Sequence, residues 1–215
     1  MKPKVLIYDF DGVICDSVGL KTDAFVELYN TENESIQKLV REYHLANGGI
    51  SRFEKIKHFE TVLLGKVYSE DENVNLAQKF AELVKEKVIS SPFIVGVKEF
   101  LEKHSTDTLQ YICTGTPEFE IKEIIERRGM VHLFKGLFGS PTTKSTIIQK
   151  IIAEVGCTKE DCLFFGDALT DYKAAYDTNV RFIGIKNDET IFPEGTFTIE
   201  NFTDNKLEIL DYESN

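Results

Sequence analysis

Residues 5–13 read VLIYDFDGV, a short apolar run followed directly by two aspartates and a glycine. An uninterrupted apolar run of this kind is typical of a parallel strand that is buried on both faces. Ligands of open α/β sheets bind beyond the carboxyl ends of the strands, which is where Asp9 and Asp11 stand. Gly12 permits a sharp turn after them. The stretch therefore predicts a buried strand, Val5 to Tyr8, that ends in a polar site.

Similar apolar runs recur along the chain and alternate with segments of helical periodicity. This alternation predicts an α/β fold, in which a doubly wound, Rossmann-like parallel sheet forms the core. The predicted strands are Val5–Tyr8, Leu109–Cys113, Leu137–Phe138, Leu163–Phe165, Arg181–Ile185 and Thr196–Ile199, and the predicted core helices are Val97–His104, Phe119–Arg128, Ser145–Val155 and Asp171–Thr178.

Residues 17–90 break the alternation, because they read as consecutive amphipathic helices with no convincing strand between them. Small residues and a proline near both ends of this interval suit a hinge. We therefore expect an inserted α-helical cap domain at 17–90, and an α/β core domain made of residues 1–16 and 91–215. The expected cap helices are Gly19–Tyr29, Glu34–Leu45, Ser51–Leu64 and Glu70–Val88.

Composition narrows the class of protein and its partners. A chain of 215 residues is long enough for one core with a smaller domain inserted into it. The formal net charge of -11 argues against a nucleic acid or an anionic membrane surface as a partner. No run is long enough to span a membrane or to serve as a secretion signal, so we expect a cytoplasmic protein. Its cysteines lack zinc-ligand spacing and are expected to be reduced thiols; a monomer is compatible with the sequence.

Two further acids, Asp167 and Asp171, follow the predicted strand Leu163–Phe165. If this strand and the first one are parallel neighbours, Asp9 and Asp11 lie at the same edge of the sheet as the second pair. Four carboxylates at a partly buried edge repel one another and raise their own pKa values unless a cation lies among them. A divalent cation that prefers oxygen ligands resolves the conflict, so the four acids predict a Mg²⁺ site.

A phosphate-binding side is predicted next to the acids. Thr114, Gly115 and Thr116 follow the strand Leu109–Cys113, and they offer hydroxyl groups and unobstructed backbone N–H groups. Lys144 stands near the start of a predicted helix and could reach the same phosphate oxygens as a point charge. Taken alone, Thr114-Gly115-Thr116 would also suit an ordinary loop, and Lys144 an exposed lysine. Position in the fold decides between these interpretations and phosphate binding.

In combination, the D-F-D-G-V of residues 9–13, Thr114-Gly115-Thr116, Lys144 and the G-D-x-x-x-D of residues 166–171 resemble the four motifs of the haloacid dehalogenase-like hydrolase superfamily. The helical insertion after the first motif is similar to that of members with a small helical cap, such as phosphoglycolate phosphatases and β-phosphoglucomutases. The match covers nearly the whole chain in order and spacing. It implies a magnesium-dependent phosphatase that hydrolyses a small phosphorylated metabolite, a phosphate monoester, through an aspartyl-phosphate.

The resemblance also implies a role for each matching residue. Asp9 matches the nucleophile and a magnesium ligand. Asp11 matches the general acid/base, and it binds the metal through its backbone carbonyl. By the same resemblance, Thr114, Gly115 and Lys144 hold the phosphate, Asp167 is a direct magnesium ligand, and Asp171 is either a ligand or a residue that orients a bound water, a role compatible with capping its own helix.

The segment Gly48-Gly49-Ile50-Ser51-Arg52 interrupts the cap helices and resembles the cap loop that reads substrates in this family. Arg52 could bind a second anionic group of the substrate, either a phosphate or a carboxylate. Alternatively, Ser51 could cap the next helix, with Arg52 as a solvated residue of its first turn. The sequence leaves both interpretations open.

Four alternative functions differ from the phosphatase in the residues that they require. A β-phosphoglucomutase-like phosphomutase keeps all four motifs and would use Arg52 to hold a second phosphate. Asp11 argues against a haloacid dehalogenase, which would resemble a branch that lacks the second acid. A phosphonate hydrolase needs a cap lysine that forms a Schiff base, and the sequence places none clearly. A non-catalytic binding module is disfavoured, because the acids at all four core positions are intact.

Overall fold

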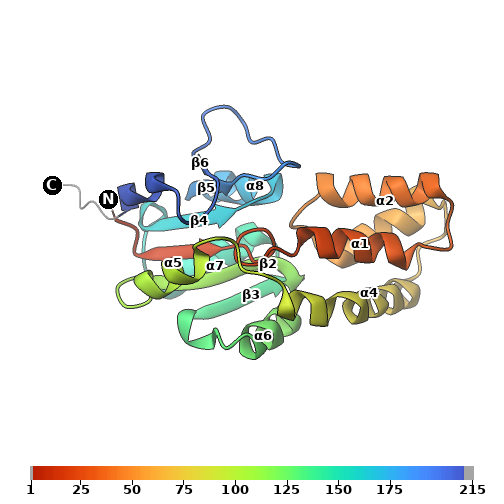
Figure 1. Cartoon of the computed structure of the whole chain (residues 1–215), viewed down its shortest axis with the longest axis horizontal. Coiled ribbons are helices and arrows are strands. Elements are labelled where there is room, and N and C mark those ends of the chain that lie inside the picture. Colours follow the sequence, from red (N-terminus) through yellow and green to blue (C-terminus); the bar gives the residue numbers. More distant parts are fainter. Residues whose placement is uncertain (1, 211–215) are drawn as a thin grey trace.

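Six parallel strands form one sheet, in the order β3-β2-β1-β4-β5-β6, in the computed structural model, which describes residues 2–210 (Figure 1). The chain enters at the central strand, moves outward on one side, and returns to build the other half. This is the strand order of a doubly wound Rossmann-like sheet, and the predicted fold class is confirmed. The strands are β1 (Val5–Tyr8), β2 (Leu109–Pro117), β3 (Gly136–Ser140), β4 (Cys162–Gly166), β5 (Arg181–Ile185) and β6 (Thr198–Ile199).

Helices cover both faces of the sheet, which explains the uninterrupted apolar runs of its strands. Side chains alternate along a strand, so Leu6 and Tyr8 point to one face and Val5 and Ile7 to the other. The first pair belongs to the hydrophobic cluster that includes residues of α5 and α6, and the second pair to the cluster that includes residues of α7 and α8. The core helices are α5 (Val97–His104), α6 (Glu118–Arg127), α7 (Lys144–Val155) and α8 (Leu169–Thr178), with 3₁₀ turns at Val131–Leu133, Lys159–Asp161 and Asn205–Leu210.

The second strand is longer than predicted. Its pairing with β3 shifts register after Cys113 and resumes at Pro117, opposite Ser140. The segment 114–116 therefore continues the strand instead of forming a loop. Pairing on either side of this segment, at Cys113 and Pro117, keeps it at the carboxyl edge of the sheet.

The helices of residues 18–90 lie together beyond the carboxyl ends of the strands, to the right of the sheet in Figure 1. Phe25 is the centre of their packing, because its ring stacks on Phe80 at 4.0 Å and meets Phe59 edge-on at 5.5 Å. The inserted helical cap is thus present; the boundaries 1–16, 17–90 and 91–215 remain a prediction, and residues 211–215 lie outside the described part. The cap elements are α1 (Val18–Leu28), α2 (Glu34–Ala46), α3 (Arg52–His58), a π-helical turn (Phe59–Leu63) and α4 (Glu70–Ser90).

Among residues 2–210, no helix combines the length and the apolar character that crossing a bilayer requires.

Arg128 fixes the point at which the cap helices return to the core. Its guanidinium donates hydrogen bonds to the carbonyls of Val88, Ile89 and Ser91 at 3.0, 2.6 and 3.0 Å. It also lies 4.2 Å above the ring of Phe93. The carbonyls at the end of a helix lack partners within the helix, and a half-buried arginine donates to them here.

We predict that Arg128→Met lowers the free energy of unfolding by about 2–3 kcal/mol, because charge-assisted hydrogen bonds to the carbonyls at the end of α4 are lost. The neighbouring Arg127 is the matched control, since it also contacts α4 but through an exposed ion pair with Glu86. Arg127→Met should cost less than about 1 kcal/mol. Urea-induced unfolding measures both values, and equal losses would contradict the role assigned to Arg128.

Candidate active site

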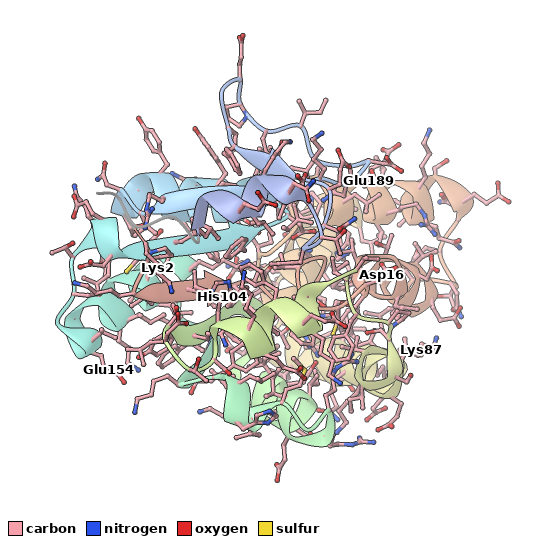
Figure 2. The ribbon with its side chains drawn as sticks, turned by 60° about the vertical axis from the view of Figure 1, so that its left-hand side comes forward. Lys2, Asp16, Lys87, His104, Glu154 and Glu189 are labelled. Carbon is pink, nitrogen blue, oxygen red and sulfur yellow. The ribbon has the colours of Figure 1, made fainter. Side chains whose placement is uncertain are left out.

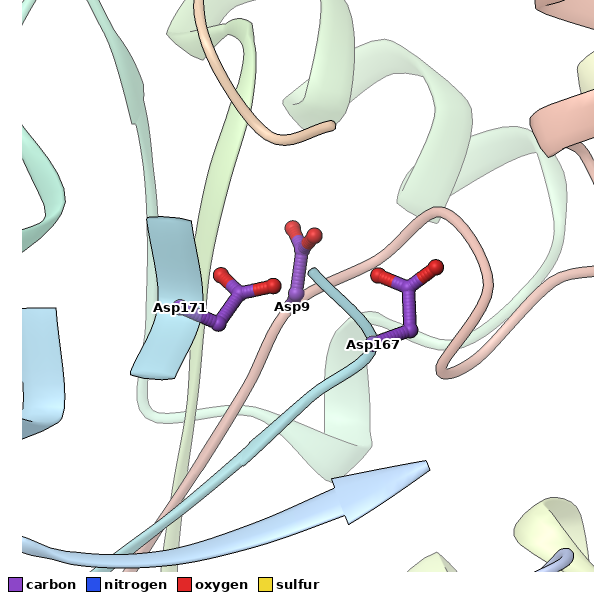
Figure 3. Close-up of side chains that lie close together, drawn as sticks. All are labelled: Asp9, Asp167 and Asp171. Carbon is purple, nitrogen blue, oxygen red and sulfur yellow. The ribbon is translucent and has the colours of Figure 1, made fainter. Parts of the chain in front are cut away.

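The carboxyl end of the sheet gathers three of the four acids that the sequence placed there. Asp9 follows β1, Asp167 follows β4, and Asp171 lies in the first turn of α8. One carboxylate oxygen from each lies within 4.8 Å of one oxygen from each of the others, and all three side chains are buried. Figure 3 shows the three carboxylates around one common space. The convergence follows from the pairing of β1 with β4, which brings the residues after both strands together.

Lys144 lies within this acidic cluster. Its Nζ is 3.0 Å from Asp9 Oδ2, and it also donates to Asp171 Oδ1. Burial alone would lower the pKa of this ammonium group, but the carboxylates of Asp171 and Asp9 outweigh it and raise the pKa. Lys144 therefore carries its charge. Its position as the first residue of α7, after the Thr143 cap, aims it at the sheet edge.

The single positive charge of Lys144 does not neutralise the three carboxylates of the cluster. Burial, together with the charges of Asp171 and Asp9, raises the pKa of Asp167 well above its usual value. Burial likewise raises the pKa of Asp171 to about 7, although Lys144 opposes the shift. The Oδ1 atom of Asp9 is buried and has no hydrogen-bond partner. An unpartnered carboxylate oxygen among buried acids fits a divalent cation that prefers oxygen ligands, such as Mg²⁺.

The two oxygens of Asp171 already have partners. One accepts from Lys144, and the other accepts the backbone N–H of Ala168 at 3.1 Å, which caps the start of α8. Asp9 keeps a free oxygen, so the geometry favours Asp9 and Asp167 as direct metal ligands. Asp171 is better suited to hold Lys144 in place.

Gly12 closes the turn around the acids. Its φ of 76° lies in the left-handed region, and an added Cβ would stand 2.1 Å from Asp167 Oδ2. Any side chain here would collide with the carboxylate and strain the backbone. The glycine that the sequence assigned to a sharp turn thus also leaves room for Asp167.

The carboxylate of Asp11 points away from the cluster and toward the cap. It accepts hydrogen bonds from Ser17 Oγ at 2.6 Å, Lys21 Nζ at 2.6 Å and Thr116 Oγ1 at 3.2 Å. Burial would raise the pKa of Asp11, but Lys21 and the hydroxyl groups lower it below the usual value. Asp11 is therefore ionised in this state. Its predicted metal contact through the backbone carbonyl remains a prediction.

Sequence reasoning did not single out Lys21. A lysine in the first cap helix reads as a solvated residue, and only the packing of α1 against the core shows its partner. The signal available was its spacing of ten residues from Asp11, which has no meaning until the path of the chain between them is known.

The cap loop lies directly on the predicted phosphate-binding residues. Thr114 is buried, and an added Cβ on Gly115 would stand 2.3 Å from the carbonyl oxygen of Gly49. An added Cβ on Gly49 would stand 2.4 Å from Thr170 Oγ1 and 2.8 Å from Lys144 Nζ. Thr170 also donates a hydrogen bond to the carbonyl of the residue before Gly49. The structure thus has the cap closed on the core.

Arg52 begins α3 after its Ser51 cap and is buried, so it is not the solvated residue of the alternative interpretation. Its guanidinium pairs with Glu120 of α6 at 2.6 Å and lies 4.9 Å from the centre of the Phe80 ring. Arg52 therefore bridges cap and core, and it also lines the cavity between the acids and the cap helices. Its predicted contact with a substrate remains a prediction.

A cavity of about 550 Å³ separates the acids from the cap helices. This volume lies within the range of sites for small molecules and cofactors. Asp16 and Glu189, both labelled in Figure 2, line it together with the site residues. The cap contributes side chains that sequence reasoning did not single out: Lys21, His44, Lys55 and Phe80.

Comparison with known proteins identifies the family. A model of haloacid dehalogenase-like hydrolases matches residues 6–185, which is most of the chain. The chain belongs to this family. The search of curated protein sequences finds no match to this haloacid dehalogenase-like hydrolase.

Solved structures share its architecture over nearly the whole length. A predicted phosphoglycolate phosphatase from Haemophilus somnus is 18% identical, with a TM-score of 0.75 over 97% of this chain and 98% of that one. A β-phosphoglucomutase from Clostridium difficile is 17% identical, with a TM-score of 0.76 over 97% and 96%. The hydrolase YfnB from Bacillus subtilis, bound to magnesium, is 18% identical, with a TM-score of 0.73 over 99% and 100%. At these identities the likeness establishes the fold alone.

We predict that Mg²⁺ raises the melting temperature of this hydrolase more at about pH 8 than at about pH 5. The carboxyl pKa values of Asp167 and Asp171 are raised in the folded, metal-free state. The folded state then holds more protons than the unfolded state, so metal-free stability falls as the pH rises through the folded pKa values. Mg²⁺ offsets this loss at high pH, and at low pH it must first displace the protons.

Thermal unfolding with and without Mg²⁺ at both pH values measures the effect. Asp167→Asn should remove most of the gain at high pH, whereas Asp177→Asn, an exposed change on α8, should retain it. A gain that is independent of pH and survives Asp167→Asn would contradict a metal site here.

We also predict that Gly49→Ala prevents cap closure in this hydrolase, because its methyl group would enter the space of Thr170 and Lys144. Gly65→Ala is the matched control: its φ of 64° is also left-handed, but an added Cβ meets nothing within 4 Å. Small-angle X-ray scattering should show a larger radius of gyration for the Gly49 variant only. Unchanged scattering from both variants would argue against the close contact of loop and core.

Proposed function

We propose that this hydrolase is a Mg²⁺-dependent phosphatase that hydrolyses a small phosphate monoester through an aspartyl-phosphate on Asp9. The observation that carries the proposal is the buried Asp9 carboxylate, with one oxygen unpartnered and the other 3.0 Å from the Lys144 ammonium. A carboxylate nucleophile needs one oxygen available for the metal and the other oriented for attack, and a transferring phosphoryl group needs cations around it. One similar solved structure is described as a predicted phosphatase and another as a hydrolase bound to magnesium, and both support this chemistry.

The proposed reaction has two steps. In the first, an oxygen of Asp9 bonds to phosphorus, the bond from phosphorus to the ester oxygen breaks, and Asp11 supplies the proton for the leaving alcohol. In the second, water attacks the phosphorus, the bond to Asp9 breaks, and Asp11 takes the proton of the water. The ionised Asp11 of this structure is in the state that the second step requires, so Asp11 must take up a proton before the first step.

Binding of the phosphoryl group is assigned to three residues. Lys144 would neutralise its oxygens, while Thr114 would donate a hydroxyl hydrogen bond and Gly115 a backbone N–H. A bound Mg²⁺, held by Asp9 and Asp167, would supply further charge neutralisation. Electrostatic positioning of this kind accounts for most of the catalysis expected in phosphoryl transfer.

The cap is proposed to enclose the substrate. With residues 17–90 as cap domain and 1–16 and 91–215 as core domain, closure brings Lys21 to Asp11 and Arg52 to Glu120. Closure would exclude water during the first step, and opening would release the products. The substrate class proposed is a small phosphorylated metabolite rather than nucleic acid, and the free cysteines suit a reducing cytoplasm.

A β-phosphoglucomutase-like phosphomutase is the second candidate. Arg52 lines the cavity, where it could exchange Glu120 for a substrate phosphate, and a solved relative carries the mutase name. Incubation with a hexose 1-phosphate and a catalytic amount of its bisphosphate separates the two. Isomerisation without release of inorganic phosphate would replace our proposal with the mutase.

The remaining alternatives have weaker support. A phosphonate hydrolase needs a cap lysine at the cavity, and the structure does place Lys55 there. Inactivation by borohydride only in the presence of a phosphonate aldehyde would favour that activity. A dehalogenase would have no use for the ionised Asp11, and a binding module would have no use for the reactive geometry of Asp9.

We predict that Asp9→Asn abolishes the release of phosphate from p-nitrophenyl phosphate, because the amide removes the attacking carboxylate. Chelation of Mg²⁺ should abolish it as well. Circular dichroism should show an intact fold, and Asp177→Asn should be fully active. Phosphate release that survives both the Asp9 substitution and chelation would refute the mechanism.

A further inference from the structure

The cap side of the cavity carries four cationic side chains, and three of them already have a carboxylate partner. Such ion pairs leave little uncompensated charge for a ligand. The pairs are Lys21 with Asp11 at 2.6 Å, Arg41 with Asp23 at 2.9 Å and Arg52 with Glu120 at 2.6 Å; the fourth cation is Lys55.

Lys55 lies in the middle of α3 and is only 3% exposed. Its Nζ is 2.8 Å from Nδ1 of His44 and 3.4 Å from the carbonyl oxygen of the same residue. The ring of Phe25 lies 5.8 Å away. Within the described residues, no carboxylate comes within ion-pairing distance of this ammonium. A buried lysine without a counterion is costly, so its position at a cavity wall calls for an explanation.

His44 orients Lys55 without neutralising it. Burial, and then the charge of Lys55, holds the pKa of His44 well below its usual value, so the ring is neutral and accepts a hydrogen bond. Burial, with help from Lys21, lowers the pKa of Lys55 to about 7. The ammonium form of Lys55 therefore has no counterion, and an anion entering the cavity would stabilise it.

We propose that Lys55, oriented by His44, is a subsite for a second anionic group of the substrate, a carboxylate or a second phosphate distant from the scissile one. This inference rests on the proposed phosphatase function. It assigns the contact to Lys55 in preference to Arg52, because Arg52 is already paired with Glu120.

The surroundings of Lys55 strengthen such a contact. Phe25 and Phe80 line the same part of the cap, and an ion pair among apolar side chains is less screened than one in water. The cavity of about 550 Å³ exceeds the volume of a single phosphate, so it has room for a substrate with an anionic group at each end. The core end would then take the scissile phosphate, and the cap end the second anion.

The test compares matched pairs of monoesters. One pair is glycerol 3-phosphate against 3-phosphoglycerate, which adds a carboxylate; the other is fructose 6-phosphate against fructose 1,6-bisphosphate, which adds a phosphate. The wild-type enzyme should prefer the anionic member of at least one pair by kcat/KM. Lys55→Met should reduce that preference roughly 10- to 100-fold, the effect of one charge-assisted contact.

Lys57→Met is the matched control, because Lys57 lies on the exposed side of α3, over the ring of Tyr68. It should leave the preference unchanged. The pair that responds to Lys55→Met identifies the anion as carboxylate or phosphate. A wild-type enzyme with no preference in either pair, or a preference that Lys55→Met leaves intact, would overturn the proposal. Lys55→Gln provides a second variant if the first does not fold.

Failure of the proposed function can be told apart from failure of this inference. If the wild-type protein releases phosphate from none of the four esters, the phosphatase assignment fails. Calorimetric binding of the same compounds to Asp9→Asn protein, with and without Lys55→Met, then still tests the subsite. Weaker binding of the anionic members alone would support it, and equal binding would overturn it.

Discussion

The burial of three carboxylates within 4.8 Å of one another is the constraint on which the site depends. Like charges at that separation repel strongly in a poorly solvated environment, so the arrangement needs cations. Lys144 supplies one from the start of α7, and the free oxygen of Asp9 leaves a position for another. The sheet makes the gathering possible, because β1 and β4 are parallel neighbours and end at the same edge.

Electrostatic pairing also connects this edge to the cap. Asp11 is held in its ionised form by Lys21, and Arg52 reaches across to Glu120, so closure completes ion pairs that an open cap would leave exposed to water. In this closed structure the proposed acid/base thus has its cationic partner on the cap. The contact links the ionised form of Asp11, which the second step of the proposed reaction requires, to the closed position of the cap.

Some elements of the structure follow from local sequence, and others differ from what the sequence predicts. The central strand is predicted by its apolar run. The ends of the core helices are predicted by glycines and capping residues, and all of these signals are local properties of the sequence. The segment after Cys113 reads as a loop but continues β2, because its pairing with β3 resumes after a register shift. The helix predicted through Leu64 changes to a π-helical turn at Phe59, whose ring packs edge-on against Phe25.

The sequence by itself determined the fold class, the inserted helices and the candidate residues of the four motifs, because each is encoded by neighbours along the chain. Only the tertiary structure decided which charges meet. It separated the Asp11 carboxylate from the other three acids, paired Arg52 with Glu120, and placed Lys55 beside His44 in the cavity wall. Those partners stand 10 to 68 residues apart in the chain, and their spacing in the sequence carries no information until the cap has packed against the sheet.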